Sequence, residues 1–380
     1  MPPDVTRVRL SSIDRLRGAV MALMLVDHVR EYFFLHQQVS DPMVLNSTSV
    51  ELFFTRLSSH FCAPVFVLLT GLGAWLYGQK NGRTRRDTAV FLAQRGLILI
   101  ALELTVVNFA WSLSLSPPKL YLQVIWAIGL SMLALSALLW LPRPVQAALA
   151  VLIMAGHNLL DPLQFTPQEA GFIPWAILHD RSLIELSPSL TLRTSYPVLP
   201  WIGIMLAGYL MGPLYRPGVA AAWRQRWLVW GGVGALLTFA VLRLVNRYGD
   251  HPWVAGATLL ESVRSFLNLT KYPPSLQFIL LTLGLGWLAL AGLERLKAGA
   301  WLDRIGAVPL FFYLGHLYLL QALYQWMAWV FGTHHAGRFG LDAVWQVWAL
   351  AAGVLWLMAG PCRALAQLKQ RSQARWLSYF

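Results

Sequence analysis

Long apolar segments separated by short polar segments make up most of the chain. A membrane-spanning helix needs about 20 mainly apolar residues, and ten segments approach or exceed this length. The segment 145–160 is short, whereas 305–331 is long enough to tilt or bend. The pattern therefore predicts an all-α bundle of about 10 transmembrane helices, at 18–35, 57–77, 90–112, 120–141, 145–160, 195–214, 227–246, 275–293, 305–331 and 343–361.

The composition is that of a polytopic membrane protein. Hydrophobic residues make up 57% of the 380 residues and charged residues only 12%, whereas soluble domains have about 25% charged residues. We expect a single domain over residues 1–380, with a membrane core at 10–361 and a cytoplasmic tail at 362–380. No cleavable signal peptide is expected, because the first apolar run is too long for one.

The distribution of charge predicts the orientation. The net charge of +13 could indicate nucleic-acid binding, but twenty of the 30 Lys and Arg residues lie on one predicted side of the bundle. Cytoplasmic loops carry such an excess, so we expect both termini in the cytoplasm and no nucleic-acid partner. Three long loops, 36–56, 161–194 and 247–274, then lie on the outer side. Aromatic residues in the last two indicate packed structure.

Two ionisable residues interrupt the first span. Asp27 and His28 lie roughly 14 Å beyond Gly18, about halfway through the hydrocarbon core. Ionisable groups at that depth are costly unless they face protein or water. Adjacent residues of a helix point about 100° apart, so Asp27 is predicted to orient a group on a neighbouring helix instead of His28. His316 is the nearest candidate by depth.

Three other spans contribute His60, Glu103 and His316. Two histidines with a carboxylate beside one of them are the minimum for general acid–base chemistry at neutral pH. The sequence therefore predicts a catalytic site formed by Asp27, His28, His60, Glu103 and His316. The alternatives are structural. Asp27 and His28 could only bridge to a neighbouring helix, His316 could hydrogen-bond a carbonyl, and His60 could be solvated near the membrane surface.

Other uses of these residues stay open. They could form the proton relay of a proton-coupled transporter, or belong to a structural partner in envelope assembly, and Glu103 could pair with Arg95. Zinc binding has weak support, because no span has a His-x3-His or Glu-x-x-His spacing, and no metal is predicted. His334 and His335 are expected to be an inert, exposed pair. The absence of GxGxxG, GxxxxGK[ST] and GxSxG motifs removes the usual support for ATP-driven transport and for a hydrolase.

Five segments together resemble one family. They are SIDRLRGAVMALMLVDHVREYFF, HFCAPVFVLLTGLGAWLYG, YPVLPWIGIMLAGYLMG, KYPPSLQFILLTLG and VPLFFYLGHLYL. From about residue 10 to 360 they are similar to bacterial members of the heparan-α-glucosaminide N-acetyltransferase-like membrane family. The resemblance implies a transmembrane acyltransferase of the bacterial inner membrane. It would move an acetyl group from cytoplasmic acetyl-CoA to an amino-sugar or other glycan acceptor on the outer side, and a homodimer is one assembly it allows.

The resemblance also implies residue roles. His28 would be the general base or acyl carrier, and His316 would stabilise the oxyanion or protonate the thiolate. The lysosomal enzyme of the family has asparagine in place of His28 and an essential histidine in the following outer loop, so His36 and His60 are alternatives. Basic residues would bind the CoA phosphates, namely Arg15, Arg17, Arg83, Arg85, Arg86 and Arg95. Residues of two motifs would contact the acceptor, namely Tyr196, Trp201, Lys271 and Tyr272.

Overall fold

The computed structural model describes residues 11–80, 82–296, 299–335 and 337–372. Helices hold 69% of the residues, which confirms a mainly helical protein. Each of the ten segments predicted as spans contains a helix. Five helical segments of the described chain are long and apolar enough to cross a membrane, namely Val50–Gly78, Arg85–Ser112, Ala221–Val245, Leu276–Arg295 and Val344–Arg371.

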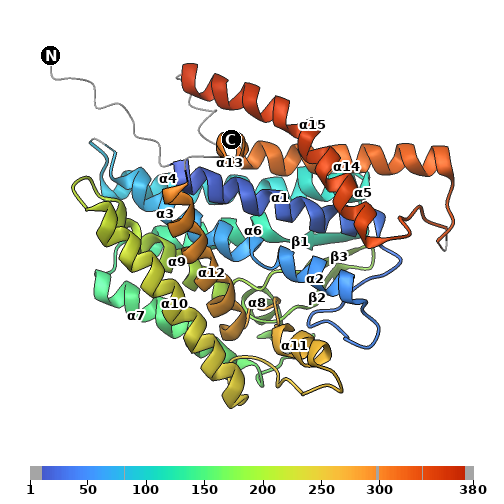
Figure 1. The fold of residues 1–380 in the computed structure, drawn as a ribbon, viewed down its shortest axis with the longest axis horizontal. Helices are drawn as coiled ribbons and strands as arrows, with labels where there is room; N and C mark the ends of the chain where they lie inside the picture. Colours follow the sequence, from blue (N-terminus) through green and yellow to red (C-terminus); the bar gives the residue numbers. More distant parts are fainter. Residues whose placement is uncertain (1–10, 81, 297–298, 336, 373–380) are drawn as a thin grey trace.

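Figure 1 shows the arrangement of the elements. The first part of the chain forms α1 (Ser11–Phe33), α2 (Val50–Ser59), α3 (Cys62–Gly78), α4 (Arg85–Leu102), the π-helical turn η1 (Glu103–Val107) and α5 (Asn108–Ser112). The middle forms β1 (Lys119–Leu122), α6 (Val124–Leu138), α7 (Arg143–Gly156), the 3-10 helix η2 (His157–Leu160), α8 (Phe172–Leu178), β2 (Leu183–Ser187), β3 (Leu190–Thr194), α9 (Leu199–Leu210) and η3 (Gly212–Tyr215). The last part forms α10 (Ala221–Val245), α11 (Leu259–Leu267), α12 (Leu276–Arg295), α13 (Ala300–Gly306), α14 (Pro309–Phe331) and α15 (Val344–Arg371).

Prolines explain why helices divide at two places. The predicted span 305–331 is divided into the end of α13 and the whole of α14, and Pro309 begins α14. Proline suits the first helical position, because its missing N–H would have no helical partner there. In the same way α2 and α3 are separate helices. Pro64 lies in the first turn of α3 and has no N–H to donate to the carbonyl of His60.

A three-stranded sheet departs from the predicted all-α fold. Its strand order is β1-β3-β2, in which β1 pairs with β3 in parallel and β2 pairs with β3 in antiparallel orientation. Residues 120–122 are predicted to begin a span, because their leucines continue the apolar run that follows. The partner strand β3 lies beyond α6, α7 and α8, so no local pattern reveals the pairing.

Helix α1 runs in the same direction as the segment formed by α13 and α14. Arg15 Nε donates to Asp303 Oδ1 at 2.9 Å, and His28 contacts His316. Both pairs are separated by 288 residues along the chain. Since helices advance equally per residue, an unchanged separation means that the two segments lie parallel and side by side (Figure 1).

The loops predicted on the outer side gather at one end of the bundle. Lys271 N donates to Asp41 Oδ2 at 3.1 Å, which joins two of these loops, and β1 joins β3. Two loops predicted on the inner side are joined by Arg224 Nε, which donates to Glu294 Oε1 at 2.9 Å. When successive helices of a bundle run in opposite directions, every second loop lies at the same end, which gives this grouping.

Glycines permit a close approach between α3 and α9. A Cβ atom added to Gly71 would collide with the carbonyl of Met205, and one added to Gly208 would collide with the carbonyl of Leu68. By contrast, a Cβ atom at Gly73, on the same helix, would have nothing within 4 Å. Small residues bring helix backbones together in membrane proteins, and Leu68 and Met205 at this contact are both fully buried.

Candidate active site

Asp27 is surrounded by three cationic side chains. Its Oδ1 accepts a hydrogen bond from Arg30 Nε at 3.0 Å, and its Oδ2 accepts one from Arg56 Nη1. Lys271 Nζ lies 4.0 Å from Oδ2. Because arginines occupy both oxygens, Asp27 does not orient His316 as predicted. It holds α1, α2 and the loop before α12 together at one point.

His28 and His316 form a hydrogen-bonded pair between α1 and α14. His28 Nδ1 and His316 Nε2 lie 2.6 Å apart, and His316 Nδ1 lies 2.7 Å from the carbonyl oxygen of Phe312. A carbonyl only accepts hydrogen bonds, so His316 Nδ1 carries a hydrogen. In the neutral ring His316 Nε2 then accepts from His28 Nδ1. This arrangement leaves Nε2 of a neutral His28 with its lone pair unused.

Two aromatic donors lie next to His28, which is only half-buried although it lies inside α1. The rings of Trp111 and Tyr313 lie 5.6 Å and 6.0 Å from the His28 ring. Trp111 Nε1 and Tyr313 Oη are both buried and make no hydrogen bond. Buried donors without partners are uncommon and costly. Both can donate to a ligand oxygen placed beside His28.

The π-helical turn η1 precedes Trp111 and contains Glu103. Glu103 is fully buried, its Oε2 accepts a hydrogen bond from Trp126 N at 3.1 Å, and its Oε1 makes none. A π-helical turn contains more residues than an α-helical turn, so it rotates the residues that follow, including Trp111. Such turns are frequent at functional sites. Glu103 therefore joins η1 to the start of α6 close to the site.

The four residues predicted to bind an acceptor lie near Asp27. Tyr272 Oη donates to Tyr196 Oη at 3.1 Å, and the Tyr196 ring lies 5.5 Å from the Trp201 ring. Lys271, the neighbour of Tyr272, reaches Asp27. Trp201 is completely buried, so it supports Tyr196 from behind and does not face an open surface.

The two alternative histidines lie in different surroundings. His60 directly follows α2 and is buried, and its ring centre lies 5.3 Å from that of Phe278. It also lies close enough to Lys271 to interact electrostatically with its charge. Its Nδ1 atom makes no hydrogen bond. His36 stacks on His335 with the ring centres 3.9 Å apart, in contact with the loop before α15. His60 is therefore the alternative that lies close to Asp27 and its cations.

The arginines predicted to bind CoA divide into two groups. Arg15 is buried, donates to Asp303, and donates to the carbonyl oxygen of Leu293 at 3.3 Å. Arg17 donates to Asp14 at 2.8 Å and to the carbonyl oxygen of Gly306, at the end of α13, at 3.0 Å. These two arginines connect α1 to the segments around α13. The others lie on or just before α4, namely Arg83, Arg85, Arg86 and Arg95, of which Arg85 and Arg86 are exposed.

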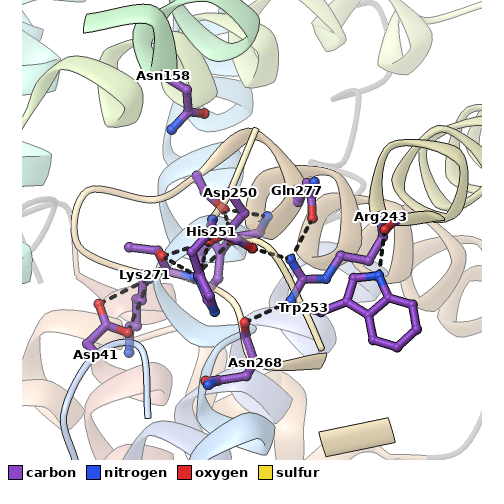
Figure 2. A network of polar contacts seen from close by, with 12 residues as sticks. Asp41, Asn158, Arg243, Asp250, His251, Trp253, Asn268, Lys271 and Gln277 are labelled. Atoms are coloured by element: carbon purple, nitrogen blue, oxygen red, sulfur yellow. Dashed lines mark hydrogen bonds and ion pairs between the residues drawn. The ribbon is translucent and has the colours of Figure 1, made fainter. Parts of the chain in front are cut away.

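A buried polar network holds the loop that carries Lys271 (Figure 2). Asp250 accepts hydrogen bonds from Thr270 N at 3.0 Å and Ser275 Oγ at 2.5 Å, and lies 2.6 Å from His251 Nδ1. Burial raises the pKa of Asp250, but the hydrogen bonds and the neighbouring His251 lower it more, so the pKa lies below its ordinary value. The network fixes the backbone next to Lys271.

Three buried arginines are not identified by sequence reasoning. The positive-inside rule treats Arg30, Arg56 and Arg243 as charges at the outer ends of spans, because it counts charges without their partners. Arg243 donates to the carbonyl oxygens of Phe266 at 2.8 Å and His251 at 2.7 Å and so holds the segment between α10 and α12 (Figure 2). The position of Arg30 could have indicated its partner, because Arg30 lies three residues after Asp27, a spacing at which opposite charges pair on a helix.

A surface hollow of about 860 Å³ lies beside η1 and β1. Asn108, Phe109 and Tyr318 are among its lining residues, but no residue predicted for the site lines it. The two unpaired donors, on Trp111 and Tyr313, lie instead beside the pair of His28 and His316. We therefore place the candidate active site at this pair.

Comparison with known proteins bears on the chemistry of this site. A family model described as heparan-alpha-glucosaminide N-acetyltransferase, catalytic, matches residues 9–243. The match covers more than half of the chain and includes Asp27 and His28. His316 and Lys271 lie outside the matched residues, and the fold brings them into contact with His28 and Asp27. No curated protein matches the chain.

Proposed function

Because the chain belongs to the family of heparan-α-glucosaminide N-acetyltransferase catalytic domains, we propose that it transfers an acetyl group from acetyl-CoA to an amino sugar or a related glycan. The pair of His28 and His316 carries this proposal, because it leaves His28 Nε2 with an unused lone pair beside two unpaired donors. Acyl transfer needs a base or nucleophile together with donors for the carbonyl oxygen. All three groups are present around one ring.

Direct transfer uses His28 as a general base. The acceptor amine attacks the carbonyl carbon of the thioester while His28 Nε2 removes a proton from the amine. The C–N bond forms, the C–S bond breaks, and the CoA thiolate takes the proton from the His28 imidazolium. Trp111 Nε1 and Tyr313 Oη donate hydrogen bonds to the carbonyl oxygen as negative charge develops on it. Histidine returns to its neutral form after each cycle.

The same pair supports transfer through an acetyl-histidine. His28 Nε2 attacks the thioester, the C–S bond breaks, and the His28 Nδ1 proton passes through His316 to the departing thiolate. The acetylated ring stays neutral because the proton has left it. The acceptor amine then attacks the acetyl group, and its proton returns to His28 Nδ1 by way of His316. The two routes differ in whether labelled enzyme accumulates when acetyl-CoA is supplied without an acceptor.

The two substrates are proposed to approach from opposite sides of a bacterial inner membrane. We assign ten spans with both termini in the cytoplasm, which the excess of basic residues and the grouping of alternate loops support. Acetyl-CoA then arrives on the side of exposed Arg85 and Arg86, which suit phosphate groups. The acceptor arrives on the outer side, where Tyr196, Lys271 and Tyr272 offer aromatic and cationic contacts.

Radiolabelled acetyl-CoA and glucosamine, supplied to the purified chain in proteoliposomes, test the proposal. We expect labelled N-acetyl product and stoichiometric release of CoA. His28→Gln should lower the rate at least about 100-fold, while exposed His334→Ala leaves it unchanged. A protein that turns over no acetyl-CoA but moves an amine in response to a pH gradient would overturn the proposal and support the transporter.

A further inference from the structure

A second cluster of ligand-type side chains lies beyond the end of α7. His157 begins η2, Asp161 directly follows η2, and His179 directly follows α8. One possible ligand atom from each residue lies within 4.8 Å of the other two. Both histidines are buried, with 1% of each exposed, whereas the Asp161 side chain is 49% exposed. The cluster is thus closed on the protein side and open to solvent on one side.

The spacing within this cluster suits a tetrahedral metal ion. His179 Nε2 lies 3.3 Å from Asp161 Oδ1. Two ligands bound to Zn²⁺ at about 2.0–2.1 Å in tetrahedral geometry are about 3.3–3.4 Å apart. His179 Nε2 also donates a hydrogen bond to the carbonyl oxygen of His157 at 3.0 Å. A metal ion at Nε2 replaces this hydrogen and requires the tautomer with its hydrogen on Nδ1, which faces Asp180.

His157 provides an independent indication of a missing ligand. Neither of its ring nitrogens makes a hydrogen bond of normal geometry, although the backbone carbonyl of Pro274 lies close enough to interact with the ring. A buried polar group without a partner costs about 1–3 kcal/mol, and native structures contain few of them. A metal ion bound to one of these nitrogens removes that cost.

Surrounding residues orient the other two ligands as in known metal sites. His179 Nδ1 lies 3.4 Å from Asp180 Oδ1, and the Trp175 ring stacks on the His179 ring at 4.8 Å. Asn158 Nδ2 donates to the second oxygen of Asp161 at 3.0 Å. A metal-bound histidine commonly presents its other nitrogen to a carboxylate, which sets its tautomer and ring orientation.

We propose that His157, Asp161 and His179 bind a zinc ion, with water completing the coordination at the solvent side. Two imidazoles and one carboxylate form a ligand set that suits Zn²⁺. The ion adds a third link between η2 and the residue after α8, beside the contacts of His179 Nε2 with the His157 carbonyl and with Asp161. It lies outside the site at His28 and takes no part in the chemistry there.

The position of the ion gives it a structural effect on acceptor binding. Arg181 lies two residues after His179, and its guanidinium lies 5.0 Å from the ring centre of Tyr272. Fixing His179 therefore also fixes the cation that covers the pair of Tyr196 and Tyr272. This effect on the acceptor rests on the proposed function, whereas zinc binding itself does not.

Zinc binding can be measured without any assay of activity. The 380-residue chain, purified without a histidine tag, is treated with a chelator, desalted and incubated with Zn²⁺ alone. Bound zinc is measured by mass spectrometry after gel filtration, and Co²⁺ serves as a spectroscopic probe of tetrahedral geometry. We expect about one zinc ion per chain, and at least about 10-fold weaker binding for Asp161→Asn and for His179→Gln.

A matched control is available at the other group of potential ligands, formed by His334, His335 and Asp342. The double variant His334→Ala/His335→Ala should bind as much zinc as the wild type. Because Asp161 is half exposed, Asp161→Asn should keep the gel-filtration profile of the wild type, which separates loss of metal from loss of fold. Equal zinc in the wild type and in both ligand variants, or loss of zinc in the control, would overturn the proposal.

Discussion

His28 Nδ1 and His316 Nε2 lie 2.6 Å apart, although 288 residues separate them along the chain. The Phe312 carbonyl sets the tautomer of His316, and His316 in turn sets that of His28. The lone pair of His28 Nε2 is therefore determined by a residue on another helix.

This relationship predicts that the two histidines act as one unit. His28→Ala and His316→Ala should each lower acetyl transfer at least about 100-fold, and the double variant should be little slower than either single variant. Steady-state kinetics on monodisperse protein measure the effect. A folded His28→Ala protein with full activity would move the chemistry to His36 or His60.

Asp27 should matter more for stability than for the chemical step. Asp27→Asn leaves Arg30 and Arg56 without their shared carboxylate, and removing one partner of a buried ion pair costs about 3–5 kcal/mol. Unfolding in detergent measures the loss of stability. Glu31→Gln is the matched control, because Glu31 is a more exposed partner of Arg30 and should cost less than about 1 kcal/mol. Similar losses of stability for both variants would show that the ion pairs of Asp27 contribute no more than the more exposed pair of Glu31.

The contact between α3 and α9 predicts different effects for two glycines on one helix. Gly71→Ala introduces a methyl group against the backbone of α9 and should destabilise the protein by about 1–3 kcal/mol. Gly73→Ala has open space and should be neutral or stabilising. Thermal unfolding of the two variants under identical conditions compares them. Equal melting temperatures would argue against the close contact.

Asp250 predicts a stability change at acidic pH. Its pKa is lower in the folded state than in the unfolded chain, where it is about 3.9. The ionised carboxylate therefore stabilises the folded state fully above about pH 4 and loses this effect as the pH falls further. Asp250→Asn should lower the melting temperature near neutral pH, and its difference from the wild type should shrink in more acidic buffers. A difference independent of pH would assign the effect to hydrogen bonding alone.

The proposed orientation predicts which exposed positions react from outside the cell. In a chain with Cys62 and Cys362 replaced by alanine, Ser189→Cys should react with a membrane-impermeant thiol reagent, because it lies in the exposed turn between β2 and β3. Arg86→Cys should react only after the cells are opened. Both replaced cysteines are buried, so their replacement leaves the exposed surface of the protein unchanged. Equal labelling of Ser189→Cys and Arg86→Cys in intact cells would contradict ten alternating spans.

Helices, and ionisable residues within apolar helices, could be predicted because each leaves a local signal. A long apolar run predicts a span. A histidine inside such a run is energetically unfavourable unless it has a polar partner, and this argument identifies His28 and His316. Trp111 and Tyr313 could not be found, because aromatic residues are ordinary in membrane helices. Only the packing around His28 shows that their donors have no partner.

Features that depend on distant parts of the chain also escape sequence reasoning. The pairing of β1 with β3 crosses three helices, and the apolar residues of β1 are equally suited to a span. The cluster at His157 combines a His-x3-Asp spacing at a helix end with His179 from a later loop. Neither half alone is specific enough to indicate a metal.

The shared direction of α1 and α14 restricts how the chain can be rearranged. In the proposed topology both helices cross the bilayer, and each passage reverses the direction of the chain, so two parallel helices must be separated by an odd number of passages. Inserting one additional crossing anywhere between them would send α14 through the membrane the opposite way and separate His316 from His28. A hairpin with two crossings, inserted at the same place, would preserve the parity and could leave the pair intact.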